Sequence, residues 1–510
     1  MRKELARFFT LAMVSALVAV AAGGGGPSRV SATDEAFNVL PLISDWVFVG
    51  AGATPPSQAA CIAVNRRCFN PAAMANSYDY AVLHAAGNMG QGKTIAVVDS
   101  FGASTIRSDL GVFNTAFGLP HLCGETGPSD PSANCASSVS PRFDIVCVQG
   151  CPPPNPPPLS NGTGLENHNL WDLEVALDVE WAHATAPLAN IVLVTTPTAE
   201  TLGVQGFQQM MNAESALIDN GSVDVISQSF GSGEGAFNNG LAALKQLRTP
   251  FEKAHASKVT VFASSGDGGT TNTMKVPVKN PAIIPYPSVI WPGSDPLVTA
   301  VGGTYLCTNA VTGTSVDSVS PPTNCRGGNA GDREPGWVVS GGGYSILFDR
   351  PDYQNVLPPG STFVGSSAGA PGKNSNMRGI PDIAYQASAR TGVLVYLTEP
   401  DFKGGTTGCG GANPCSTGWY VVGGTSSSSP QWAGLVALAD QMAGHNLGFI
   451  NPALYRLANN AAKYAADFYD VTRGNNGYDA SKGWDAVTGL GTPDAAKLIP
   501  DLIAEVRATD

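Results

Sequence analysis

Apolar runs rich in Val and Ile recur along the sequence and alternate with segments of helical character. The series begins at residues 93–101, and later runs span 191–196, 223–230 and 258–267. Continuous apolar runs spaced by helices are typical of parallel strands that are buried on both faces. Parallel strands need long crossover connections, which are usually helices. The sequence therefore predicts an α/β fold with a mainly parallel central sheet and helices on both faces.

The chain shows no internal repeat, and no linker divides residues 71–505. We expect one large domain there, preceded by a short segment of weak pattern at 33–70. The stretch CPPPNPPPLSNGTG at 151–164 can form neither a helix nor a central strand. It predicts an exposed, polyproline-like loop.

The first 32 residues have the form of a secretory signal peptide. A basic start precedes an apolar run from Phe8 to Ala22, which is shorter than the roughly 20 residues that a membrane span needs. Cleavage after Ala22 and cleavage after Ala32 are equally compatible with the sequence. We expect a secreted, extracellular protein without membrane contact once the signal is removed.

The 10 cysteines fall into five close-set couples. An even number of cysteines behind a signal peptide indicates disulfides in an oxidising compartment, whereas a zinc site would require tighter, repeated spacings. The connectivity stays open, and our hypothesis is that neighbours pair. The couples are Cys61 with Cys68, Cys123 with Cys135, Cys147 with Cys151, Cys307 with Cys325, and Cys409 with Cys415.

The formal net charge is −12, from 28 Lys and Arg against 40 Asp and Glu. Nucleic-acid binding is disfavoured because phosphate contacts need clusters of Lys and Arg. An acidic chain loses charge as its carboxylates protonate, so its self-repulsion falls in mild acid.

Two carboxylates stack one turn apart in a predicted helix at 170–187. Glu174 and Asp178 have no basic neighbour in the sequence, because no Lys or Arg occurs between Arg142 and Lys245. On a helical wheel both carboxylates border apolar residues, so we expect perturbed pKa values of the kind found at functional sites. The other polar residues of the helix gather on its opposite side, which we expect to face solvent: Asp172, Glu180 and His183.

The segment WYVVGGTSSSSPQWAGLVALAD at 419–440 predicts a strand, a Gly pair and a helix, with Ser426 at the helix start. A helix N-terminus offers backbone N–H groups that stabilise an oxyanion. GTS before a Pro-containing helix is the nucleophile motif of subtilisin-like peptidases, but those enzymes need a histidine base in an HGT or HGS setting. None of the six histidines has one.

Asp267, in VFASSGDGG at 261–269, stands where the subtilisin pattern carries an oxyanion-hole Asn. An Asp can donate a hydrogen bond to an oxyanion only when it is protonated. A Glu with a pKa of about 4.3 can act as a base in mild acid, whereas an imidazole is protonated there and cannot. These residues together indicate an acid peptidase.

The combined motifs resemble the sedolisin, or serine-carboxyl peptidase, family over about residues 70–500. Glu174 and Asp178 in EVALD, Asp267 in SSGDGG and Ser426 in GGTSSSSP match its four catalytic positions in order. The resemblance implies a subtilisin-like fold and peptide hydrolysis through an acyl-enzyme on Ser426. Glu174 would be the general base, Asp178 would orient it, and protonated Asp267 would bind the oxyanion with the N–H of Ser426.

Two further assignments rest on the resemblance. The first places Ser229 and Gly231, in SQSFG, along the substrate backbone. The second places one structural Ca²⁺ near the C-terminus of the peptidase domain, since carboxylates and carbonyl oxygens suit this ion. Its expected ligands are the side chains of Asp470 and Asp485 and the carbonyls of Val471, Ser481 and Gly483.

The chain departs from the family pattern in two respects. Some relatives have Glu where Asp99 stands and Trp where Phe230 stands, so an extended carboxylate network should be weaker or water-bridged here. Relatives usually carry a large N-terminal prosegment, and residues 33–70 are too few to supply one. We therefore expect no full prosegment.

The leading hypothesis is a secreted, calcium-stabilised acid endopeptidase that acts as a monomer on polypeptides. One alternative is a neutral subtilisin-like peptidase, in which Asp99 would orient a histidine. Another is a catalytically silent binding protein on the same scaffold. Subsite preference, and endopeptidase against tripeptidyl exopeptidase activity, stay open.

Overall fold

A computed structural model describes the following residues: 40–41, 45–127, 135, 140–148, 168–197, 204–237, 239–271, 287–316, 331–359, 361, 376–398 and 417–508. All of them belong to one compact unit, residues 36–510. The predicted signal peptide, at 1–32, and the Pro-rich loop, at 151–164, lie outside the described residues.

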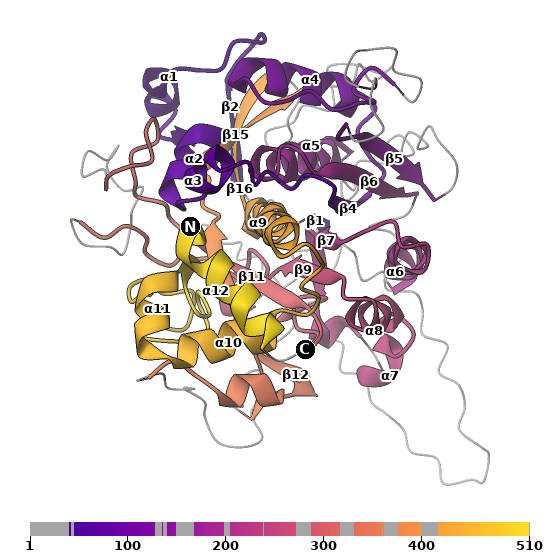
Figure 1. Ribbon diagram of the computed structural model, residues 1–510, viewed down its shortest axis with the longest axis vertical. Helices are drawn as coiled ribbons and strands as arrows, with labels where there is room; N and C mark the ends of the chain where they lie inside the picture. The colour runs from indigo at the N-terminus through magenta and orange to yellow at the C-terminus, as the bar shows by residue number, and fades with distance from the viewer. Residues whose placement is uncertain are drawn as a thin grey trace, which may run out of the picture. The chain divides into compact units, whose positions relative to one another are not determined.

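A seven-stranded sheet forms the centre of this unit, in the order β14-β11-β9-β7-β4-β6-β5 (Figure 1). Every neighbouring pair in it is parallel, which confirms the predicted parallel sheet. In chain order its strands are β4 (Thr94–Ser100), β5 (Phe143–Cys147), β6 (Asn190–Thr196), β7 (Val225–Gln228), β9 (Thr260–Ser264), β11 (Thr299–Thr304) and β14 (Ile383–Gln386).

Helices cover both faces of this sheet. The α-helices of the described residues are α1 (Gln58–Ala63), α2 (Pro71–Ser77), α3 (Ala81–Ala85), α4 (Ile106–Phe117), α5 (His168–Thr185), α6 (Val204–Asp219), α7 (Leu241–Leu244), α8 (Thr249–Ala256), α9 (Ser428–Ala443), α10 (Asn451–Asn459), α11 (Ala461–Asp467) and α12 (Ala495–Arg507). Among them, none combines the length and the apolar character that crossing a membrane requires.

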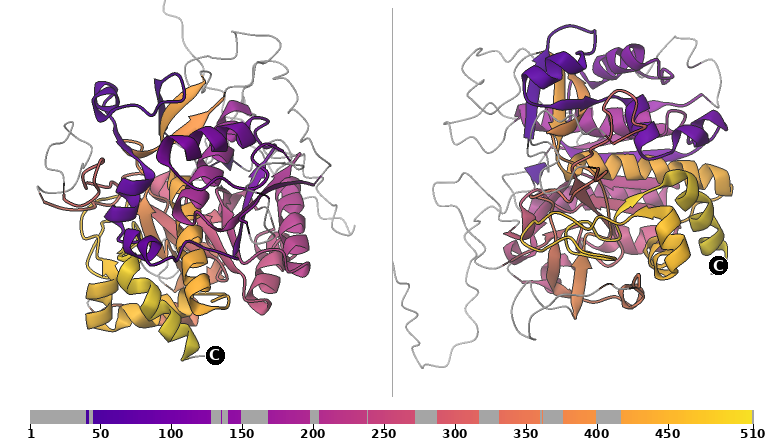
Figure 2. Two further views of the ribbon diagram at one scale, coloured as in Figure 1. Left: turned by 45° about the horizontal axis from the view of Figure 1, so that its top comes forward. Right: turned by 90° about the vertical axis from the view of Figure 1, so that its left-hand side faces the viewer.

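Strand β4 shows how the sheet divides the interior into two cores. Successive side chains of a strand point to opposite faces, so Ile95 and Val97 join the core around α5 and α9. Ala96 and Val98 join the other core, which contains residues of α6 and α8. The predicted helices on both faces are thus confirmed, with α5 and α9 on one side and α6 and α8 on the other (Figure 2).

Smaller sheets surround the central one. One has the order β2-β16-β15-β3 and another the order β1-β8-β10, while β12 pairs with β13 and β17 with β18. Three of these strands come from the N-terminal segment at 33–70. The bounds are β1 (Leu40–Pro41), β2 (Asp45–Gly50), β3 (Arg67–Phe69), β8 (Phe230–Gly233), β10 (Ile290–Trp291), β12 (Gly343–Asp349), β13 (Met377–Ile380), β15 (Thr391–Leu397), β16 (Gly418–Gly423), β17 (Phe468–Tyr469) and β18 (Thr492–Pro493).

Helix α5 is buried on all sides, so the prediction of a solvent-facing side was wrong. Asp172, Glu180 and His183 are at most 1% exposed, because α4 and β15 pack on α5 in addition to the central sheet and α9. Glu180 accepts a hydrogen bond from the Tyr396 N–H at 3.0 Å. The His183 ring lies 3.0 Å from the Pro120 carbonyl. These polar groups therefore have partners in the protein interior.

Two of the hypothesised disulfides are confirmed, Cys61–Cys68 and Cys123–Cys135. Cys147 and Cys307 are also disulfide-bonded, and their hypothesised partners lie outside the described residues. The same holds for the whole couple Cys409 and Cys415. No cysteine among the described residues is free.

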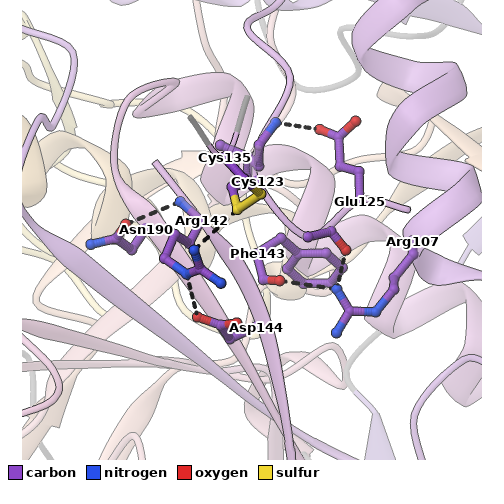
Figure 3. Close-up of a disulfide and its surroundings, with 10 residues drawn as sticks. Arg107, Cys123, Glu125, Cys135, Arg142, Phe143, Asp144 and Asn190 are labelled. Atoms are coloured by element: carbon purple, nitrogen blue, oxygen red, sulfur yellow. Dashed lines mark hydrogen bonds and ion pairs between the residues drawn. A yellow bond between two sulfur atoms is a disulfide. The ribbon is translucent and has the colours of Figure 1, made fainter. Parts of the chain in front are cut away.

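The Cys123–Cys135 bridge lies beside the edge strand β5 (Figure 3). Arg142 Nη1 lies 3.0 Å from Cys123 Sγ, and the Arg142 N–H donates to Asn190 Oδ1 at 3.0 Å. Arg107 Nη1 donates to the Phe143 carbonyl at 3.0 Å and lies over the Phe143 ring. Arg142 thus attaches the disulfide to the edge of the sheet, and Arg107 attaches α4 to the same edge.

Candidate active site

Ser426 lies in a short turn between strand β16 and helix α9. The turn is a 3₁₀ helix, η6 (Thr425–Ser427), and it follows Gly424, whose φ of 140° is a conformation that favours glycine. Ser426 itself is completely buried. The predicted order of strand, Gly pair and helix is therefore confirmed, and the turn fixes the position of the serine.

Glu174 and Asp178 come to this turn from α5, which packs against both η6 and α9. The Ser426 hydroxyl lies close enough to Glu174 to lower the pKa of that carboxyl, although the pair does not have full hydrogen-bond geometry. Ser229 donates a hydrogen bond to Asp178 Oδ1 at 2.9 Å. The structure thus brings Ser426, Glu174, Asp178 and Ser229 together.

A third buried carboxyl joins the pair, and we call Asp99, Glu174 and Asp178 the carboxyl trio. All three are fully buried. Burial raises the pKa of Glu174 and Asp178 well above the ordinary range, and the charge of Asp99 raises both further. Burial alone raises the pKa of Asp99 to about 8.

The groups that shift these pKa values are carboxyls and hydroxyls, and no Lys or Arg is among them. Three carboxyls so placed titrate as a unit. Once one proton has left, removing a second would put two like charges side by side in a dry site. The three carboxyls therefore lose their protons one at a time, and a trio with two negative charges is disfavoured.

Asp267 reaches the same site from the end of strand β9. Its Oδ1 accepts hydrogen bonds from the Thr425 N–H at 2.8 Å and the Thr425 hydroxyl at 2.9 Å. Thr425 Oγ1 in turn accepts from the Gly266 N–H at 3.1 Å. Asp267 also raises the pKa of Glu174, so the two carboxyls are neighbours. The sequence reasoning overlooked Thr425, although its place beside the serine in GTS could have indicated it.

The run SGGGYS at 340–345 packs against the turn that precedes Asp267. The Gly341 N–H donates to the Gly266 carbonyl at 2.6 Å. A Cβ at Gly341 would lie only 2.0 Å from the Ser265 carbonyl oxygen, so a larger residue would push the turn before Asp267 out of place. This close approach explains why position 341 is a glycine.

Gly231 lies in strand β8, directly after Phe230. A Cβ at Gly231 would come within 2.6 Å of Ile290 Cδ1 on the neighbouring strand β10. Phe230 is buried and packs on Phe207, with ring centroids 6.0 Å apart. Its ring belongs to the apolar core on the α6 side and cannot extend the carboxyl trio by hydrogen bonding.

No histidine side chain of the described residues takes part in this site. His84 bonds to the Thr185 carbonyl and His183 to the Pro120 carbonyl. His121 pairs with Glu125, and His445 bonds to the Asn446 carbonyl. The ring of His255 packs on Phe449. The side chain of His168 is outside the described residues.

The five predicted calcium ligands gather around one turn after α11. Asp470 Oδ1 accepts from the Gly483 N–H at 3.0 Å, and Asp485 Oδ2 accepts from the Ser481 N–H at 2.9 Å. The two carboxylates thus hold the two ends of the turn at 481–483. Val471, next to Asp470, is buried.

The donor atoms of this turn fit a hard cation. No hydrogen bond among the described residues ends on the carbonyl oxygens of Val471, Ser481 or Gly483. Buried carbonyls normally have partners, and Ca²⁺ accepts carboxylate and carbonyl oxygens together. The described residues contain no cluster of three or more His, Cys, Asp or Glu that could hold a metal, so the carbonyls would have to complete the coordination.

Comparison with known proteins agrees with this fold. The profile of the subtilase family matches residues 174–484. Kumamolisin from Bacillus sp. (strain MN-32) is 29% identical over 447 residues, covering 85% of this chain and 64% of that protein. Sedolisin from Pseudomonas sp. (strain 101) is 32% identical over 435 residues, covering 84% and 60%. Human tripeptidyl-peptidase 1 is 27% identical over 366 residues, covering 67% and 53%.

A solved structure, Pseudomonas sedolisin (serine-carboxyl proteinase) complexed with two molecules of pseudo-iodotyrostatin, has the same fold. The TM-score is 0.58 at 24% identity, and the match covers 87% of this chain and 99% of that chain. The chain belongs to the subtilase family. Within it, the chain is a member of the sedolisin family, which its motifs resemble. It spans roughly three-fifths of the length of these curated relatives.

Proposed function

We propose that this chain is a serine-carboxyl endopeptidase that cleaves polypeptides in mild acid. The observation that carries the proposal is the position of Ser426 beside a buried carboxyl trio, and no Lys or Arg of the described residues shifts the pKa of these carboxyls. No histidine of the described residues can replace the carboxyls as the base. The relatives named serine-carboxyl proteinase and peptidase support the proposal.

The proposed reaction begins with attack of Ser426 Oγ on the peptide carbonyl, while Glu174 takes the hydroxyl proton. The C–N bond breaks as Glu174 returns this proton to the leaving amine. Water then attacks the acyl-enzyme with Glu174 again as base, which releases the acid and regenerates Ser426. Asp178 orients Glu174 and shares its charge, and the Ser229 hydroxyl holds Asp178 at 2.9 Å.

Asp267 would donate a hydrogen bond to the oxyanion, as would the N–H of Ser426. The hydrogen bonds from Thr425 hold Oδ1 of Asp267, so the donated proton would be carried by Oδ2. An ionised Asp267 would repel the oxyanion. Activity should therefore fall when Asp267 loses its proton, which gives the enzyme an acidic working range.

One Ca²⁺ ion would bind at the turn at 481–483, held by Asp470, Asp485 and the nearby carbonyls. Its role there would be structural, because it would neutralise two carboxylates whose pKa values burial raises.

We also propose that the protein is secreted. The disulfides support this, because such bonds persist in oxidising compartments.

The test is hydrolysis of a long unstructured peptide between about pH 3 and pH 8, with product analysis by mass spectrometry. Ser426→Ala should abolish cleavage, and Glu174→Gln should slow it by a factor of about a hundred or more, since general-base catalysis contributes about that much. Glu180→Gln is the matched control, because Glu180 is equally buried on the same helix. Internal cleavage would support an endopeptidase, and release of tripeptides alone would contradict it.

Asp267→Asn tests the acidic range separately. An amide donates at every pH, so the alkaline limb of the pH profile should move upward in this variant. An unchanged alkaline limb would contradict the proposed role of Asp267. Wild-type activity that peaks above neutrality would instead favour a neutral subtilisin-like peptidase, and full activity of Ser426→Ala would refute the proposed nucleophile.

A further inference from the structure

The loop after strand β9 carries Asp267, and backbone hydrogen bonds fasten this loop directly after that residue. The Gly269 N–H donates to the Val339 carbonyl at 2.9 Å, and the Thr270 N–H donates to the Asn476 carbonyl at 3.0 Å. Val339 and Asn476 are both far from this loop in the sequence. The position of Asp267 therefore depends on two distant segments of the chain.

The side chain of Asn476 is buried where these segments meet, with only 6% of the residue exposed. Its Nδ2 donates to the Ser340 carbonyl at 2.7 Å and to the Ala486 carbonyl at 2.9 Å. Its Oδ1 accepts from the Tyr478 N–H at 3.0 Å. A side-chain amide has two N–H donors and one carbonyl acceptor. Both donors and the acceptor are thus engaged, and a carboxylate could not supply this set.

Ser340 is fixed to the central sheet, and it fixes Asn476 in turn. The Ser340 hydroxyl accepts a hydrogen bond from the Gly303 N–H of β11 at 2.9 Å, and β11 pairs with β9. The side-chain bond from Asn476 to Ser340 therefore holds the Asn476 backbone carbonyl against the Thr270 N–H. The fit is close, because a Cβ at Gly269 would lie only 2.6 Å from that carbonyl oxygen.

We propose that Asn476 is a positioning residue, which holds Asp267 at the place where the oxyanion forms. The role of Asp267 rests on the proposed function, whereas the fastening of its loop by Asn476 does not. A misplacement of about 1 Å can cost about a hundredfold in rate, and loss of a whole oxyanion donor costs about a hundredfold to a thousandfold in kcat. The oxyanion exists only after the carbonyl has been attacked, so a misplaced donor lowers kcat and leaves KM nearly unchanged.

The preceding residue, Asn475, provides a matched control. It is exposed, and its side chain bonds to groups of its own turn. Nδ2 donates to Asp479 Oδ1 at 2.6 Å, and Oδ1 accepts from the Gly477 N–H at 2.8 Å. Asn475→Ala therefore removes the same side chain one position away without removing a contact to the Asp267 loop.

Kinetics of the full-length chain test the proposal. Asn476→Ala should lower kcat by about tenfold or more with KM within about twofold of the wild type, and Asn475→Ala should match the wild type. In an Asp267→Ala background, Asn476→Ala should cause no further loss of kcat, because the group that it positions is absent. Asn476→Ser, which keeps one side-chain donor, replaces the alanine variant if that variant does not fold.

Hydrogen exchange in the Ser426→Ala background provides a readout that needs no activity and is free of self-digestion. Peptides covering 267–271 should exchange faster in Asn476→Ala than in the parent or in Asn475→Ala. Peptides covering β4 should exchange equally in all three proteins, which shows that the fold is intact.

Unchanged exchange at 267–271 would overturn the fastening of the loop by Asn476. Faster exchange with an unchanged kcat would overturn the positioning role, and so would an equal loss of kcat in the Asp267→Ala background. If the wild type cleaves peptide at no pH while exchange at 267–271 still responds, the proposed peptidase function fails and the fastening of the loop stands.

Discussion

Glu214 makes the stability of this protein depend on pH in a way that one substitution can remove. The carboxyl is fully buried on α6 and accepts a hydrogen bond from Gln228 Nε2 at 2.6 Å. Burial is the main cause that raises its pKa from 4.5 to about 8. The folded state therefore keeps the proton over a pH range in which the unfolded chain releases it.

This difference between the folded and unfolded pKa determines whether stability rises or falls with pH. Since the folded pKa is raised, the contribution of Glu214 to stability is complete below about pH 4 and is lost as the pH rises toward 8. Each pH unit within that window is worth about 1.4 kcal/mol. Between about pH 4.5 and pH 7 the free energy of unfolding should therefore fall by about 3 kcal/mol through this group alone.

Glu214→Gln should remove that part of the pH dependence, because an amide keeps the acceptor for Gln228 and does not titrate. The assay is urea unfolding at about pH 4, 5.5 and 7 in the Ser426→Ala background. The free energy of unfolding should fall more steeply with rising pH in the wild type than in the variant. Over this interval the variant should gain up to about 3 kcal/mol relative to the wild type. Glu252→Gln, an exposed position, should follow the wild type. Parallel curves for Glu214→Gln and wild type would refute the reasoning.

Three other predictions concern stability. Arg378→Met breaks an ion pair with Asp382 in which both side chains are fully buried and Nη2 lies 2.6 Å from Oδ2; urea unfolding should show a loss of about 3 to 5 kcal/mol. Replacing both Cys61 and Cys68 by Ser opens a loop of sequence separation 7 and should cost about 2.5 kcal/mol, measured by thermal unfolding. A calcium chelator should lower the Tm of the wild type and of Asp479→Asn, an exposed carboxylate nearby, but should not affect Asp485→Asn, which already melts lower.

The central sheet could be predicted because its signal is local. The stretches 95–98 and 191–194 are apolar at every position, as expected for strands buried on both faces. The turn at Ser426 could also be predicted from the sequence, since a strand, glycines and a helix follow one another directly. The four proposed catalytic residues lie on such well-marked elements, which is why their positions could be expected before their geometry was known.

The errors concern contacts between distant parts of the chain. The wheel for residues 170–187 assumed that a helix has a solvent side, but α4 and β15 cover that side of α5. Glu180 is bonded to Tyr396, 216 residues away, and nothing in either local sequence indicates this. Strand β1 was overlooked for the same reason, because two residues form no pattern until β8 is beside them.

Helix α9 links the chemistry to the global stability of the molecule. Its residues from Ser428 to Asp440 are all buried, and it packs against α5 and five strands of the central sheet. The Ser426 turn continues directly into this helix, so the turn cannot open on its own without exposing the core, and both belong to one cooperative unit. On heating, catalytic competence and tertiary structure should therefore disappear in a single transition, and no folded but inactive form should accumulate before it.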